Sequence, residues 1–268
     1  MKSTLIDIEP LCGLPVTLDT EACKLEFRKG MNQPDFYHRT GADLESVYVA
    51  DLTDEDRARR LYSVSSSLWL DGEESLWRDA KVTYGLVLFA PGDIGGEYIK
   101  SSGQFHPILP GMKEGTPEIY SVLHGEGHFM LQHADAPFDK TDDPVVIKVK
   151  AGEAFVVPPN YGHLQINPGP EPLLFSYIVM DGLKGEYGPY KAKKGAMYYE
   201  MNDAEKPFVY NNNYPEKLPL NELNAGDICQ IPGLNKAVKY PRARDILNDI
   251  KFVTDPEAFP ASAGLAGL

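Results

Sequence analysis

Short apolar runs recur along the middle of the chain, from Lys81 onward. Each run combines β-branched and aromatic residues, and Gly, Pro, Asn or Asp separates many of them. The runs cover residues 81–90, 96–101, 118–124, 127–133, 144–150, 153–158, 163–167 and 172–181. Strands this short and this regularly spaced predict an all-β sandwich or barrel. No helical-length period lies between them, which disfavours a parallel βαβ sheet.

The flanking segments have weaker patterns. Alternation over residues 16–20 and 24–28 predicts short strands or extended arms near the start. Thr53, followed three residues later by Asp56, resembles a capping box and predicts a helix over residues 52–62. Two further short helices are expected over residues 72–79 and 242–250.

These patterns indicate one domain with extensions rather than two domains. We expect an arm with short helices packing on the barrel over residues 1–80, a barrel over 81–215 and a C-terminal extension over 216–268. A chain of 268 residues buries a core large enough to be stable without disulfides.

The charge of the chain excludes several classes of partner. It carries 26 Lys and Arg against 39 Asp and Glu, a formal net charge of −13. Because a negative surface without a basic run repels phosphate backbones and anionic lipids, we expect no nucleic acid and no membrane partner. The apolar start is interrupted by Asp7 and Glu9 and is no signal peptide. Cys12, Cys23 and Cys229 form no CxxC motif, so a reducing, cytoplasmic location is expected.

Four polar residues in the strand-rich block have the spacing of a metal site. Gln104 and His106 are two residues apart, so on a strand their side chains point to one face. Glu118 and His163 each open another strand. Three strands can therefore direct a carboxylate, two imidazoles and an amide oxygen to one point, which suits a divalent transition metal. Gln104 either ligates through its amide oxygen or is a hydrogen-bonded strand residue.

These positions resemble the cupin signature. Five fixed positions match the second cupin motif, namely Gly152, Pro158, Asn160, His163 and Asn167. In the first motif, Gln104 stands where the first His of an HxH pair is usual, and Gly125 follows Glu118 at the usual interval. Longer blocks resemble the cupin-type (archaeal-type) phosphoglucose isomerases, in order at residues 91–106, 116–132, 151–167 and 186–195. The resemblance covers roughly residues 12–215 and implies a cupin jelly-roll β-barrel with short peripheral helices.

The resemblance also implies a chemistry. The family binds one divalent metal ion (Fe, Mn, Ni or Zn), which acts as a Lewis acid on a small sugar or sugar phosphate. Its metal-ligand positions map to Gln104, His106, Glu118 and His163. Its substrate-binding positions map to Ser101, Gly103, Tyr120 and Tyr187. Glu118, or a base next to it, is expected to move a proton between C1 and C2 as glucose-6-phosphate and fructose-6-phosphate interconvert.

The chain departs from the family at several substrate positions. Val179 stands where the family has an active-site Tyr, Gly185 where it has an active-site His, and Leu86 or Val87 where it has a Thr. Losing polar partners weakens the binding of a phosphosugar. Other functions therefore stay open: dioxygenase, lyase or other sugar isomerase chemistry at a facial triad of ligands, or a non-catalytic sugar-binding cupin.

The remaining polar residues receive simpler interpretations. His124, His128 and His133 are expected at the surface or behind the ligands. Because the net charge opposes an anionic substrate, binding would depend on local positive features, and the candidates are the metal, the amides around Gly103 and Lys100. Cupin barrels expose sheet edges, so a homodimer, with a role for the N-terminal arm, is expected.

Overall fold

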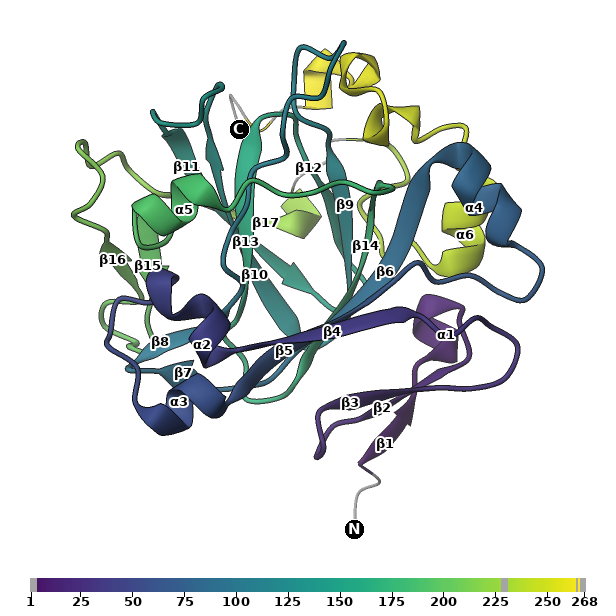
Figure 1. Ribbon diagram of the computed structural model, residues 1–268, viewed down its shortest axis with the longest axis horizontal. Helices are drawn as coiled ribbons and strands as arrows, with labels where there is room; N and C mark the ends of the chain where they lie inside the picture. The colour runs from purple at the N-terminus through teal and green to yellow at the C-terminus, as the bar shows by residue number, and fades with distance from the viewer. Residues whose placement is uncertain (1–3, 228–230, 264, 266–268) are drawn as a thin grey trace.

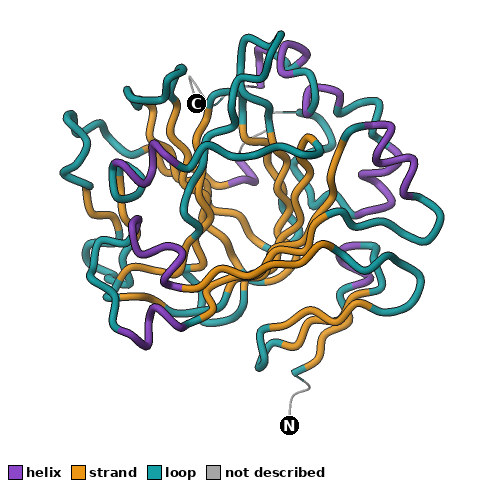
Figure 2. The backbone as a smooth tube through the Cα atoms, in the orientation of Figure 1, coloured by secondary structure: helices purple, strands orange, loops and turns teal. Residues whose placement is uncertain are grey.

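Two six-stranded sheets dominate the computed structural model, which describes residues 4–227, 231–263 and 265 (Figure 1, Figure 2). In hydrogen-bonded order, the first sheet contains β12 (Ala154–Val157), β9 (Glu118–His124), β14 (Leu173–Met180), β6 (Val82–Phe89), β5 (Arg60–Ser66) and β4 (Asp35–Thr40). The second contains β17 (Asn221–Asn224), β11 (Asp142–Lys150), β10 (Glu126–His133), β13 (Tyr161–Asn167), β8 (Glu97–Lys100) and β7 (Asp93–Ile94).

The eight strands β6 and β8 to β14 form a jelly roll. When these strands are numbered one to eight along the chain, the two sheets have the orders 6-3-8-1 and 5-4-7-2. This order of antiparallel strands, with strands 1, 3, 6 and 8 in one sheet and strands 2, 4, 5 and 7 in the other, is that of a jelly-roll barrel. The predicted all-β cupin jelly roll with short peripheral helices is therefore confirmed.

Each barrel strand coincides with one of the predicted apolar runs. The turns between them also follow from the sequence. Between β9 and β10, Gly125 has a φ of +80°. A Cβ at this position would lie 3.1 Å from the carbonyl oxygen of Pro172, so both conformation and space favour glycine there.

The helix predicted over residues 52–62 is only partly correct. α3 (Asp54–Ala58) begins with the expected capping box, in which the Asp56 N–H donates to Thr53 Oγ1 at 3.1 Å. The chain then turns into β5, where Leu61 is fully buried in the core between the sheets. Burial of this segment in the sheet therefore overrides its helix propensity.

The other helices are short. α4 (Glu74–Ala80) occupies the region expected from residues 72–79, and α6 (Tyr240–Asp245) lies at the start of the one expected over 242–250. The remaining α-helices are α1 (Glu9–Cys12), α2 (Gly41–Leu44) and α5 (Gly188–Ala192). The 3-10 helices are Glu45–Val47, Ala225–Asp227, Lys251–Val253, Pro256–Ala258 and Ala261–Ala263. Within the described part of the chain, no helix has the length and apolarity to cross a membrane.

The segments on either side of the barrel also contribute strands. β1 (Leu5–Asp7), β2 (Val16–Asp19) and β3 (Lys24–Phe27) form a separate small sheet, and β15 (Tyr198–Glu200) pairs with β16 (Phe208–Tyr210). β4 and β5 extend the first barrel sheet, and β17 runs parallel to β11. The division at residues 80 and 215 stays a prediction. Cys12 and Cys23 are free thiols, and Cys229 lies outside the described residues.

Both faces of the first sheet are buried, which explains its nearly continuous apolar runs. Along β6, Val87 and Phe89 face the core between the sheets, whereas Leu86 and Leu88 belong to a second cluster outside it. The C-terminal segment completes this outer cluster. There the hydroxyl of Tyr240 accepts a hydrogen bond from Trp77 Nε1 at 2.7 Å and donates to Glu73 at 2.8 Å. The extension therefore packs on the barrel, opposite the interior that holds the polar cluster.

Candidate active site

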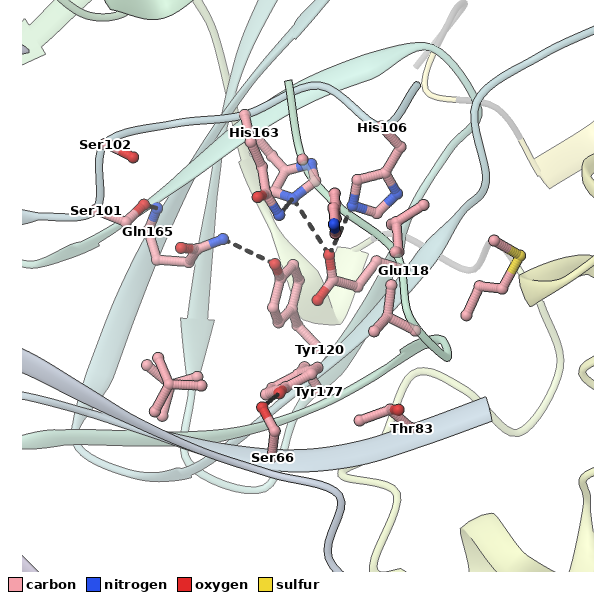
Figure 3. A pocket seen from close by; sticks show the side chains of 18 of the residues that line it. Ser66, Thr83, Ser101, Ser102, His106, Glu118, Tyr120, His163, Gln165 and Tyr177 are labelled. Carbon is pink, nitrogen blue, oxygen red and sulfur yellow. Dashed lines mark hydrogen bonds and ion pairs between the residues drawn. The ribbon is translucent and has the colours of Figure 1, made fainter. Parts of the chain in front are cut away.

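A pocket of about 730 Å³ contains the predicted polar cluster and is lined by strands of both sheets (Figure 3). All eight residues singled out from the sequence line it: Ser101, Gly103, Gln104, His106, Glu118, Tyr120, His163 and Tyr187. These residues therefore converge in one cavity, although they are spread over more than eighty residues of sequence.

Three of the four predicted ligands form a tight buried cluster. Glu118 Oε2 lies 3.2 Å from His106 Nε2 and 3.2 Å from His163 Nε2. The two imidazole rings are almost perpendicular, with centroids 5.0 Å apart. These three residues are the one group of His, Cys, Asp or Glu side chains within the described chain whose ligand atoms lie close enough together to hold an ion.

Backbone carbonyls fix both imidazoles so that their Nε2 atoms face the cluster. His106 Nδ1 donates to the carbonyl oxygen of Thr116 at 2.6 Å, and His163 Nδ1 donates to that of Tyr161 at 3.2 Å. Since a carbonyl only accepts, each neutral ring carries its proton on Nδ1 and a lone pair on Nε2. His106 Nε2 and Glu118 Oε2 are buried without a hydrogen-bond partner. Three acceptors this close need a cation or a shared proton between them.

The Glu118 carboxyl is ionised at neutral pH. Burial raises the pKa of this carboxyl, but hydrogen bonds from His106 and His163 when their Nε2 atoms carry protons, together with the positive charge of those rings, outweigh burial and lower the pKa to about 2. With neutral rings, a cation between the three side chains would stabilise the carboxylate in the same way. Beside it, the Tyr120 hydroxyl is buried next to this carboxylate, and both effects raise its pKa well above the usual range. The cluster thus combines a fixed negative charge with a phenol that keeps its proton.

The loop between His106 and Glu118 is held by the second cupin motif. Asn160 Oδ1 accepts a hydrogen bond from the Gly115 N–H at 2.9 Å. Asn160 itself has a φ of +64°, a conformation that Asn tolerates better than most residues. One residue of the second motif therefore anchors the loop between two of the predicted ligands, His106 and Glu118.

Gln104, the fourth predicted ligand, lies beside the cluster, at a longer distance than the 3.2 Å that separates the other ligand atoms from Glu118. Its Nε2 is 3.4 Å from His163 Nε2. The side chain fits because the neighbouring segment has a glycine: a Cβ at Gly185 would lie 2.1 Å from Gln104 Oε1. Two of the departures from the family pattern, at positions 104 and 185, are thus in direct contact.

The predicted substrate-binding residues line the pocket on both sides of the cluster. Tyr120 accepts a hydrogen bond from Gln165 Nε2 at 2.8 Å, and the Gln165 N–H donates to Ser101 Oγ at 3.1 Å (Figure 3). Gly103 has a φ of +77° and is packed so closely under Tyr190 that a Cβ would lie 2.5 Å from the ring. Tyr187 is 37% exposed and lies at the mouth.

A pair of residues that the sequence did not single out also lines the pocket. Tyr177 and Ser66 join strands β14 and β5 through their hydroxyls, 2.5 Å apart (Figure 3). The Tyr177 ring lies over Gly85, where a Cβ would be 2.3 Å from it. The available signal was the two-residue period of the strand, since Tyr177 shares a face of β14 with Val179.

The expectation that Lys100 faces an anionic substrate is wrong. The Lys100 ammonium is 3% exposed, pairs with Glu97 and donates to the carbonyl oxygen of Val47 at 2.7 Å. Lys100 does not line the pocket. Among the described residues that do, Lys184 is the one Lys or Arg. The interior ion pair fixes the segment around Val47 to strand β8.

The other barrel histidines lie outside the pocket, as predicted. His124 donates through Nδ1 to the carbonyl oxygen of Pro172 at 2.9 Å. His128 and His133 lie 2.6 Å and 2.8 Å from carboxylates of Glu200 and Asp142, respectively. None of the three lines the pocket.

Comparison with known proteins identifies relatives across most of the barrel. A family model described as glucose-6-phosphate isomerase matches residues 38–217. The glucose-6-phosphate isomerase of Thermococcus gammatolerans is 28% identical over 152 residues, which is 57% of this chain and 73% of that protein. The enzyme of the same name from Pyrococcus furiosus is 25% identical over 154 residues, or 58% of this chain and 74% of that one.

Solved structures give partial matches. A Bacillus subtilis oxalate decarboxylase matches with a TM-score of 0.31 and 21% identity, over 45% of this chain and 26% of that chain. An oxalate oxidase structure matches with a TM-score of 0.31 and 23% identity, over 44% of this chain and 49% of that chain.

Proposed function

The chain belongs to the glucose-6-phosphate isomerase family, and we propose that it is a metal-dependent aldose–ketose isomerase of sugar phosphates. The proposed substrates are glucose-6-phosphate and fructose-6-phosphate or a closely related sugar. One observation carries the proposal: three buried acceptor atoms meet inside the pocket at positions that match the family's ligands.

The residues present fit a divalent metal ion. His106, Glu118 and His163 would hold it through Nε2, Oε2 and Nε2, and of these atoms His106 Nε2 and Glu118 Oε2 have no hydrogen-bond partner. Two imidazoles and a carboxylate suit Fe, Mn, Ni or Zn. When bound, the metal would polarise adjacent oxygens of an open-chain sugar. Gln104 would lie beside this site, with its Nε2 3.4 Å from His163 Nε2.

Glu118 is the proposed base. Its carboxylate is unprotonated and lines the pocket, so it can accept the C2 proton of an aldose and return it to C1. The hydroxyl proton of O2 passes to O1 in the same conversion, so that atoms and charge balance. Tyr120 keeps its proton, accepts a hydrogen bond from Gln165 and donates its own O–H to Glu118, so it would orient this carboxylate in the pocket.

The loop before Gln104 is the proposed phosphate site. Within the described residues, the backbone N–H groups of Ser102 and Gly103 donate to no other protein group. Ser101 uses its Oγ as an acceptor for the Gln165 N–H, which leaves the hydroxyl hydrogen available to a ligand. These neutral donors would bind the phosphate, because Lys100 is paired inside the protein.

Metal analysis combined with an isomerase assay tests the proposal. We expect gently purified protein to contain about one divalent ion per chain and to interconvert the two sugar phosphates. His163→Ala should lose the metal and the activity, because it removes a ligand that no neighbour replaces. The matched control is His133→Ala, an imidazole outside the pocket, which should keep both.

The outcomes separate the alternatives. Stoichiometric metal without turnover of either sugar phosphate would contradict the isomerase and favour another reaction at the same triad. Protein without metal, or unchanged metal content in His163→Ala, would contradict the site assignment itself. Circular dichroism of both variants shows whether loss of metal follows from the missing ligand or from unfolding.

A further inference from the structure

Two neighbouring side-chain contacts connect the same two strands across the pocket. β9 in the first sheet carries Glu118 and Tyr120, and β13 in the second sheet carries His163 and Gln165. On each strand the two residues are two positions apart, and all four side chains line the pocket. Glu118 Oε2 lies 3.2 Å from His163 Nε2, and Gln165 Nε2 donates to the Tyr120 hydroxyl at 2.8 Å (Figure 3). The Gln165 contact therefore lies beside the proposed metal site.

The backbone of Gln165 also holds the proposed phosphate loop. Its N–H donates to Ser101 Oγ at 3.1 Å, and its carbonyl oxygen accepts from the Ser101 N–H at 2.9 Å. The Gln165 side chain is buried, being part of a residue that is 8% exposed. A buried amide costs free energy unless it is hydrogen-bonded, so the bond to Tyr120 fixes this side chain in place. One residue thus sets the position of Ser101 and of the phenol relative to each other.

The direction of this hydrogen bond determines where the Tyr120 O–H points. An amide N–H only donates, so the phenol oxygen is the acceptor and the phenol hydrogen is left for Glu118. Burial raises the pKa of Tyr120 well above its usual range, and the charge of Glu118 and a hydrogen bond to it act in the same direction. Glu118 Oε2 has no hydrogen-bond partner, so the phenol is left to bind Oε1. This bond would fix the rotation of the carboxylate, with Oε2 towards the imidazoles.

We propose that Gln165 is a positioning residue, which directs the Tyr120 O–H at Glu118 and so holds this carboxylate in the orientation that proton transfer requires. The role rests on the proposed function, in which Glu118 moves a proton between C1 and C2. Gln165 acts through Tyr120 and not through the sugar. Because small errors in the position of a base lower the rate of proton transfer, loss of this bond should lower kcat rather than raise KM.

Replacement of the amide tests this role. Gln165→Met keeps the length of the side chain but cannot donate, and we expect kcat to fall at least about tenfold, with KM within about twofold and metal affinity unchanged. Gln165→Glu accepts where Gln donates, so it should lower kcat further by drawing the Tyr120 O–H away from Glu118. An unchanged kcat in both variants, or a raised KM with kcat unchanged, would overturn the proposal.

Gln132 provides a matched control for the loss of a buried hydrogen bond. It is 2% exposed, and its Nε2 donates to the Tyr214 hydroxyl at 2.9 Å, but it does not line the pocket. Gln132→Met should lower the thermal unfolding temperature, as Gln165→Met does, and leave kcat unchanged. Gln165→Met combined with Tyr120→Phe should be no slower than Tyr120→Phe alone, since Gln165 acts through this phenol. An equal fall in kcat in the Gln132 variant, or additive losses in the double variant, would contradict the positioning role.

Crystal structures of the metal-loaded protein test the geometry without relying on turnover. In the unmodified protein the Glu118 carboxylate should have one orientation, with the Tyr120 hydroxyl on Oε1. In Gln165→Met the carboxylate should rotate or occupy more than one orientation, and a carboxylate that stays in place would overturn the proposal. If the unmodified protein turns over neither sugar phosphate, the proposed function fails, and the same pair of structures still decides whether Gln165 orients Glu118.

Discussion

The base and the mouth of the pocket are built differently. At the base, His106, Glu118 and His163 are no more than 5% exposed, and carbonyl groups orient both imidazoles. At the mouth, Tyr37 and Tyr187 are 44% and 37% exposed, and no side-chain hydrogen bond to either occurs within the described residues. The side chains at the base are therefore held rigidly, as a metal site requires. Residues at the mouth can be substituted, and the substrate preference changed, with little loss of stability.

The largest effect is expected when the negative charge of Glu118 at the base of the pocket is removed. Glu118→Gln replaces the anion between two imidazoles with an amide, and we expect the affinity for a divalent ion to fall at least about 100-fold, with loss of turnover. Competition with a chromogenic chelator measures the affinity. Glu200→Gln is the matched control, a buried carboxyl beside His128 outside the pocket. Equal affinity in the Glu118 and Glu200 variants would contradict the ligand role.

The next prediction concerns the support of the base. Asn160→Gly keeps the left-handed backbone conformation but removes the acceptor for the Gly115 N–H. We expect metal affinity to fall about tenfold, since the loop from His106 to Glu118 loses its anchor, and stability to fall by about 1 kcal/mol. Chelator competition and denaturant unfolding give the two values. A loss of stability with unchanged affinity would show that the anchor does not position the ligands.

A smaller effect is expected where base and mouth meet. Gly185→Ala places a Cβ against Gln104 Oε1 and must displace this side chain. We expect a changed KM, with the change relieved in the double variant with Gln104→Ala, because coupled neighbours are non-additive. Gly188→Ala is the control, since a Cβ there meets nothing within 4 Å. Additive effects in the double variant would argue against the contact.

The smallest effect is expected from the Ser66 and Tyr177 pair, which lines one side of the pocket. Ser66→Ala removes the hydroxyl that contacts Tyr177 and should shift KM a few-fold, at a cost near 1 kcal/mol in stability. Tyr177→Phe should give a similar change, and the double variant should add little to either. If both variants leave KM unchanged, the pair supports the sheet and does not contact substrate.

The barrel and the convergence of His106, Glu118 and His163 could be predicted because each depends on a local rule. The eight apolar runs have strand lengths and turn residues between them, and the ligand spacing follows the pleat of short strands. The start of β5 could not be predicted, since residues 60–62 continue a sequence pattern that favours a helix. They form a strand because Leu61 is buried in the core between the sheets. The fate of Lys100 depends on Val47, a contact between distant segments that no spacing along the chain reveals.

The position of the C-terminal segment has a consequence for how the chain folds. The Tyr240 hydroxyl contacts Trp77 and Glu73, 163 and 167 positions earlier, and β17 pairs with β11 from more than seventy residues away. Contacts this distant in sequence close slowly, because a long loop must be ordered before they form. During synthesis, the cluster on the outer face of β6 stays incomplete until residues 240–253 are made. Assembly of the chain is therefore expected to be slow and, over that interval, dependent on protection from aggregation.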